Sequence, residues 1–174
     1  MFSNSMYTTK GTHTMNDFEQ VFQGDVWIMR LPDNMNVERG IEIPTSNGKL
    51  VVQEGEMTGH HHYVDTLIRP SADVIVGKET GPFDIFTDPV LKEKFSKKRA
   101  DATAKLYTAE PVARQLVADN ILLRPDLVVG LLEVEHGPMN LYHQEHSSIG
   151  LLPGRYVVGR QIESVAGEER RVAD

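Results

Sequence analysis

The sequence predicts a mainly β fold in a single domain, a barrel or a sandwich that carries a small helical insertion. Short apolar runs recur between turn residues, for example at 26–29 and 127–134, and runs of this length bounded by Gly, Pro and Asn are typical of strands. The pair Asn47-Gly48 favours a tight hairpin turn because both residues readily adopt positive φ angles. A length of 174 residues suits one domain with its own core.

The polar segment 1–17 is rich in Ser, Thr and Asn, and we interpret it as a flexible N-terminal arm. A single β-rich domain follows over 18–163, and we interpret the charged segment 164–174 as an exposed tail. The expected strands of the domain lie near 26–31, after the turn at Gly24-Asp25, and near 50–53, 57–67, 74–76, 127–134 and 155–162.

Residues 83–124 interrupt the β pattern, and we interpret them as a helical excursion from the scaffold, serving as a lid or a contact surface. Asp88-Pro89 fits a helix N-cap followed by proline at the first helical position. The stretch from there to Lys105 is rich in Lys, Glu and Ala and is compatible with one exposed helix. A second short helix is expected within 110–120, where Val112 and Leu116 lie at helical spacing.

The net charge of −7 argues against a nucleic-acid partner, which usually needs a basic surface. No apolar run approaches the roughly 18 residues of a membrane span, and residues 1–20 lack the apolar core of a secretory signal. We therefore expect no nucleic-acid or membrane partner and a cytoplasmic location, which for a phage-encoded chain means the host cytoplasm or the virion. The absence of cysteine leaves histidine and carboxylate as the good metal ligands.

Five of the seven histidines fall in two short clusters, at 60–62 and at 143–146. A strand places residues i and i+2 on one face, so His60 and His62 would point the same way and His61 the opposite way. The second cluster leaves its geometry open, because His143 and His146 share a face on a helix but not on a regular strand. Either a turn or bulge lies between them, or only one of them joins the site.

Together the clusters predict a divalent transition-metal site (Zn, Fe, Mn or Ni) with His60, His62, His143 and His146 as ligands. Glu145 would share a face with His143 on an unbroken strand, which makes it a substitute ligand or a general base. Neutral imidazole and carboxylate are ligands that such ions accept. A metal-free hydrogen-bonded network and unrelated surface histidines remain open as alternatives.

Four motifs occur in order along the chain: Gly59-His60-x-His62, His143-x-x-His146, Pro153-Gly154-x-Tyr156 and Arg160-Gln161-x-Glu163. This order resembles a group of small bacterial and phage proteins whose activity is uncharacterised. The resemblance implies that the two histidine clusters belong together. The first motif, with later strands, a Pro-Gly turn and a distal histidine, also resembles more loosely the cupin superfamily, which implies a cupin-like β scaffold that carries a metal.

Three functions remain open. The first is a metal-binding, cupin-like protein of undetermined activity. The second is a non-enzymatic structural or assembly protein, such as a phage virion component, and the third is a small-ligand or protein-binding module. We expect a homo-oligomer or a larger protein assembly. An enzyme would present the histidines in an open pocket, whereas a structural protein would close them or place them at an interface.

Overall fold

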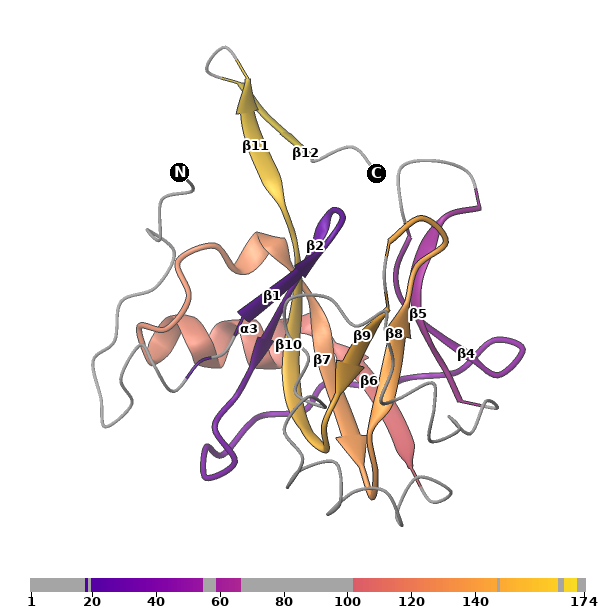
Figure 1. The fold of residues 1–174 in the computed structure, drawn as a ribbon. Helices are drawn as coiled ribbons and strands as arrows, with labels where there is room; N and C mark the ends of the chain where they lie inside the picture. Colours follow the sequence, from indigo (N-terminus) through magenta and orange to yellow (C-terminus); the bar gives the residue numbers. More distant parts are fainter. Residues whose placement is uncertain are drawn as a thin grey trace.

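Two antiparallel sheets and one α-helix make up the body of the chain in a computed structural model, which describes residues 18, 20–54, 59–66, 102–146, 148–165 and 168–171 (Figure 1). The predicted mainly β fold is confirmed. Of the two predicted forms it is the sandwich, because the two sheets pack against a shared core and do not close into a barrel.

The larger sheet has six strands in the order β1-β2-β10-β7-β6-β3, and the smaller has four in the order β4-β5-β8-β9. The strands of the larger sheet are β1 (Gln20–Gln23), β2 (Val26–Arg30), β10 (Gly154–Arg160), β7 (Val128–Glu135), β6 (Thr103–Thr108) and β3 (Glu42–Ile43). Those of the smaller are β4 (Lys49–Glu54), β5 (His61–Asp65), β8 (Met139–Tyr142) and β9 (Ile149–Leu151). The remaining elements are the helix α3 (Ala109–Ala118), the 3-10 turn η3 (Pro125–Leu127), and the hairpin strands β11 (Ile162–Val165) and β12 (Glu168–Arg171).

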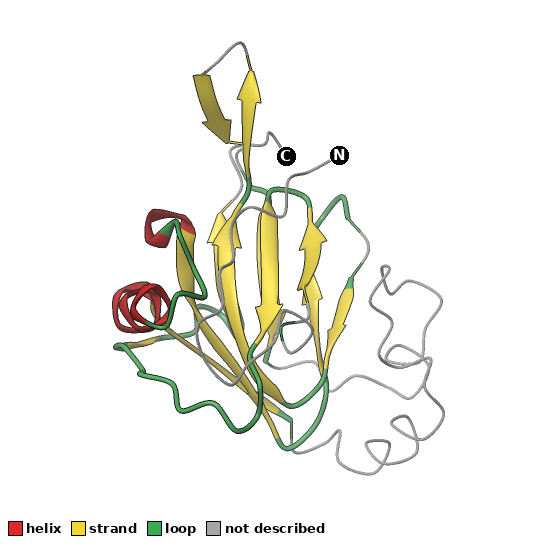
Figure 2. Cartoon of the chain, turned by 90° about the vertical axis from the view of Figure 1, so that its left-hand side faces the viewer, coloured by secondary structure: helices red, strands yellow, loops and turns green. Residues whose placement is uncertain are grey.

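Two hydrophobic clusters hold three layers together. The first lies between the sheets and joins Ile28 and Leu132 of the larger sheet to Val64 and Leu141 of the smaller. The second lies on the other face of the larger sheet and includes Leu116 of α3, which forms the third layer (Figure 2). The central strand β7 is covered on both faces, and this explains why its sequence is a nearly continuous apolar run instead of an alternating one.

The predicted hairpin turn at Asn47-Gly48 is confirmed. Both residues have positive φ angles, 50° and 74°. The flanking residues Ser46 and Lys49 exchange two backbone hydrogen bonds of 2.9 Å, and the carbonyl of Gly48 accepts a further bond of 2.7 Å from the amide of Thr66. The turn therefore leads into β4, and the Gly48–Thr66 bond extends the pairing of β4 with β5, the strand that carries His61 and His62.

In its described part, residues 102–124, the predicted helical excursion over 83–124 is only partly helical. The helix expected within 110–120 is α3, but Thr103–Thr108 form the strand β6, although the composition favours a helix up to Lys105. Packing overrides composition here, because Leu106 enters the core between the sheets while Tyr107 faces the helix layer. The arm 1–17, the strand expected at 74–76 and the segment 83–101 lie outside the described residues.

The charged segment 164–174 contains most of the hairpin β11–β12, in which Ile162 pairs with Arg171 and Val165 with Glu168. Glu168 and Glu169 are exposed. Across the residues that the structure describes, no helix has the length and apolar character needed to span a bilayer.

Candidate histidine site

His62 lies between the two sheets and is fully buried. It belongs to β5 of the smaller sheet, yet both of its ring nitrogens contact residues at the β1–β2 hairpin of the larger sheet. Nδ1 lies 2.8 Å from Oε1 of Gln23 and Nε2 lies 2.8 Å from Oδ1 of Asp25. The ring therefore links the two layers. The neighbouring His61 points to the outer face of the sheet and contacts the ring of Tyr63.

Both partners of His62 are hydrogen-bond acceptors. The amide of Gln23 is oriented by its own Nε2, which donates to the carbonyl of Leu141 at 3.3 Å, so its Oε1 faces the imidazole. Asp25 is also buried, with 3% of its side chain exposed. A ring that donates from both nitrogens is an imidazolium, and we interpret His62 and Asp25 as a buried ion pair between the sheets.

The histidine rings form a column that runs from this buried pair towards the surface. The centroid of His143 lies 4.4 Å from that of His62, and His146 stacks on the other side of His143 at 4.6 Å. His143 is buried and His146 is exposed. The chain leaves the strand after Tyr142, and this local bend allows residues three apart to stack, as one of the predicted alternatives required.

His60 and Glu145 form the outer edge of the cluster. The ring of His60 meets that of His143 edge to face, with 6.0 Å between centroids. Its Nδ1 lies 3.7 Å from Oε2 of Glu145, which is beyond hydrogen-bonding distance. Within the described part of the chain, this nitrogen is buried and makes no hydrogen bond.

Gln144 holds the two clusters together. Its Nε2 donates to the carbonyl of Gly59 at 2.9 Å, and its Oε1 accepts from the amide of His61 at 3.0 Å. One side-chain amide thus bonds to the backbone on both sides of His60. Gly59 itself has a φ of +90°, a conformation that suits glycine and turns the chain into β5.

The structure thus brings together the five residues predicted as ligands, but their geometry differs from that of a complete metal coordination site. Among the residues that the structure describes, no three His, Asp or Glu side chains are arranged to hold a metal ion. His62 has no nitrogen to offer. Nδ1 of His143 accepts the amide hydrogen of Glu145 at 3.1 Å, so His143 would have to give up this bond to bind a metal with neutral imidazole.

Sequence spacing does not predict the roles of three residues that hold the cluster in place, Gln23, Asp25 and Gln144. Gln23 and Asp25 lie 39 and 37 residues before His62, and a single sequence carries no signal for such a pairing. Gln144 sits inside the second cluster, and its position between the histidines is the only sequence feature that points to it.

Comparisons of the chain with protein-family models, with curated proteins and with solved structures found no match. The geometry of the histidine cluster is therefore the basis for its functional interpretation.

Proposed function

We propose that the protein binds a divalent transition metal ion (Zn, Fe, Mn or Ni) at the outer edge of the histidine cluster. The observation that carries the proposal is the pair formed by Nδ1 of His60 and Oε2 of Glu145. Two ligand atoms about 2.1 Å from a tetrahedral metal ion lie about 3.4 Å apart, which is close to the 3.7 Å between these atoms. A metal ion between them would also satisfy the buried nitrogen of His60.

The remaining ligands would come from the second cluster. His146, which is exposed, would coordinate after its ring turns away from His143, and His143 would coordinate after its Nδ1 releases the amide of Glu145. His62 supports the site without coordinating, because its ring packs against His143 and is fixed by Asp25. Metal-binding histidines commonly depend on such supporting contacts for their orientation.

The test is metal binding to tag-free protein, measured by elemental analysis and by calorimetric titration with Zn²⁺. We expect about one equivalent of metal, and an affinity that falls at least about tenfold in His60→Ala and in Glu145→Gln. Binding should weaken as the pH falls through about 6, because the imidazole ligands must be neutral.

His136→Asn is the matched control, since His136 is exposed, has a φ of 67° that Asn tolerates, and lies outside the cluster. Affinity unchanged by His60→Ala, or lost equally in His136→Asn, would exclude the site.

A second candidate function is a non-enzymatic structural or assembly protein, such as a phage virion component. The closed inner half of the cluster favours it, because His62, Asp25 and Gln23 satisfy one another and pin the two sheets. Large apolar side chains on the surface also suit a homo-oligomer or a larger assembly, and these are Phe22, Ile41, Val117 and Leu123. A cytoplasmic or virion location is compatible with both candidates, and metal-free protein that forms a defined oligomer would favour the second.

A further inference from the structure

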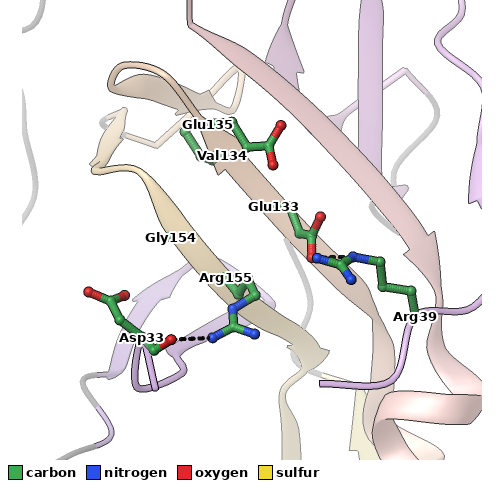
Figure 3. A pocket seen from close by; sticks show the side chains of 7 residues that line it. All are labelled: Asp33, Arg39, Glu133, Val134, Glu135, Gly154 and Arg155. Carbon is green, nitrogen blue, oxygen red and sulfur yellow. Dashed lines mark hydrogen bonds and ion pairs between the residues drawn. The ribbon is translucent and has the colours of Figure 1, made fainter. Parts of the chain in front are cut away.

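An open hollow lies on the helix-covered face of the larger sheet, at the end that α3 leaves uncovered (Figure 3). It measures about 300 Å³ and is lined by Asp33, Arg39, Glu133, Val134, Glu135, Gly154 and Arg155. The volume is at the small end of the range of ligand pockets. Both the loop after β2 and the strands β7 and β10 contribute to its walls.

Glu133 lines the hollow and is a buried carboxylate, with 5% of its side chain exposed. Its Oε1 accepts a hydrogen bond of 2.7 Å from Nε of Arg39. In the sheet register it lies between two basic residues, Lys105 on β6 and Arg155 on β10. Arg39 is 53% exposed, so the buried carboxylate of Glu133 is compensated by a partner that reaches it from the surface.

The two guanidinium groups of the hollow are held in place by the protein. Arg39 bonds to Glu133, and Nη2 of Arg155 donates to the carbonyls of Pro32 and Asp33, at 3.2 Å and 2.8 Å. Figure 3 shows Arg39 bonded to Glu133 and the guanidinium group of Arg155 turned towards Asp33, with Glu135 farther along the strand of Glu133. A planar guanidinium fixed in this way is suited to receive a carboxylate.

The lining carries charges of both signs, two arginines against three acidic residues. A simple anion would meet the carboxylates of Glu133 and Glu135, and a simple cation would meet the arginines. A ligand with one charge of each sign satisfies both sets. Glu133 is already engaged by Arg39, whereas half of the Glu135 side chain is exposed and its Oε2 lies 4.0 Å from Nε2 of the exposed His136.

We propose that this hollow binds a small zwitterion of amino-acid to dipeptide size. Its carboxylate lies against Arg39 and Arg155, and its ammonium group lies against Glu135. This site is separate from the histidine cluster and does not depend on the function proposed for it.

The test is an NMR titration of the full chain with L-alanyl-L-alanine, following the backbone amides of β7 and β10. Two blocked analogues of the same size carry one charge each, the N-acetylated dipeptide and the C-terminal amide. We expect saturable shifts at Glu133, Glu135 and Arg155 with the zwitterion, and affinities at least about tenfold weaker for both blocked forms, because each lacks one charge-assisted contact.

Glu135→Gln should reduce the affinity for the zwitterion to that for the acetylated form while leaving the fold intact, since this side chain is half exposed. Replacing Arg39 alone would leave the buried charge of Glu133 without its partner. The arginine is therefore tested in the double variant Arg39→Met/Glu133→Leu, which should abolish binding. Arg114→Gln removes an exposed arginine of α3 and should bind like the wild type. The absence of saturable shifts with the zwitterion, equal affinity for a blocked form, or unchanged binding in Glu135→Gln would overturn the proposal.

Discussion

At the scale of single residues, the contact that matters most is the one between Asp25 and His62. Both side chains are almost completely withdrawn from water, at 3% and 0% exposed. Removing one member of a buried ion pair leaves the other charge without a partner, which typically costs about 3–5 kcal/mol. Removing both together avoids that penalty, so the two positions should be strongly coupled.

This coupling can be measured by urea denaturation of Asp25→Asn, His62→Leu and the double variant. We expect each single substitution to lower the free energy of unfolding by about 3 kcal/mol or more. The double variant should lose less than the sum of the two, by at least about 1 kcal/mol. Asp33→Asn is the control, because that carboxylate is 81% exposed in its pair with Arg30. Strictly additive losses at Asp25 and His62 would mean that the two do not form an ion pair.

At the scale of elements, local signals were sufficient where a local interaction decides the structure. The Asn47-Gly48 turn depends on the φ angles that these two residues accept, and α3 depends on an apolar face that includes Val112 and Leu116. Alternation along β5 likewise separates the buried His62 from His61. Each of these features could be predicted from residues within a few positions of one another.

The strand β6 could not be predicted in this way. It follows a Lys- and Glu-rich stretch, and its own sequence, Thr103–Thr108, has only two buried residues, Leu106 and Tyr107. The segment is a strand because all six of its residues pair with β7. The candidate site shows the same division, since the meeting of the two histidine clusters could be anticipated, whereas the contacts of His62 with the β1–β2 hairpin could not.

The loop that carries His60 is held by the Gln144 clamp, and this gives a prediction at the element scale. Gln144→Glu keeps the shape of the side chain but replaces the donor to the carbonyl of Gly59 with a carboxylate oxygen that repels it. We expect His60 to lose its position and the Zn²⁺ affinity to fall about tenfold. The melting temperature should change little, because the clamp lies at the surface.

Gln115 supplies a matched control for this experiment. Its side-chain amide makes the same two-bond clamp on another loop, donating to the carbonyl of Asn36 at 2.5 Å and accepting from the amide of Glu38 at 2.7 Å. Gln115→Glu should therefore loosen that loop without changing the Zn²⁺ affinity. An unchanged affinity in Gln144→Glu would show that the clamp does not position His60.

At the scale of the whole molecule, the hairpin β11–β12 projects from the layered body (Figures 1 and 2). It pairs only within itself among the described strands, and an isolated two-stranded hairpin is marginally stable in water. Among the described residues, Gln161 and Arg124 join it to the body. Gln161, just before the hairpin, bonds to the carbonyls of Gly24 and Asp25, and Arg124 binds both Asp126 of η3 and Glu169 of β12. The order of the hairpin should therefore depend on Arg124.

Amide hydrogen exchange in residues 162–171 tests this dependence. Arg124→Gln should raise exchange there while β7 stays protected and the melting temperature changes little, because exposed ion pairs contribute weakly to global stability.

The hydrogen bond from Arg124 lowers the pKa of Asp126 below its ordinary value of 3.8. Folding thus favours the ionised carboxylate, and its contribution is present above pH 3.8 and is lost as the pH falls through the lower, folded value.

Acidification of the wild-type protein from neutral pH to below this window removes the carboxylate that orients Arg124, so exchange in residues 162–171 should rise towards that of Arg124→Gln once it is corrected for its intrinsic pH dependence. The Arg124→Gln hairpin is already released, so its corrected exchange should change little over the same range. Arg114→Gln, which removes ion pairs with Glu38 and Glu110, should behave like the wild type. If residues 162–171 stay equally protected in Arg124→Gln, then the hairpin is ordered by contacts other than the Arg124 bridge.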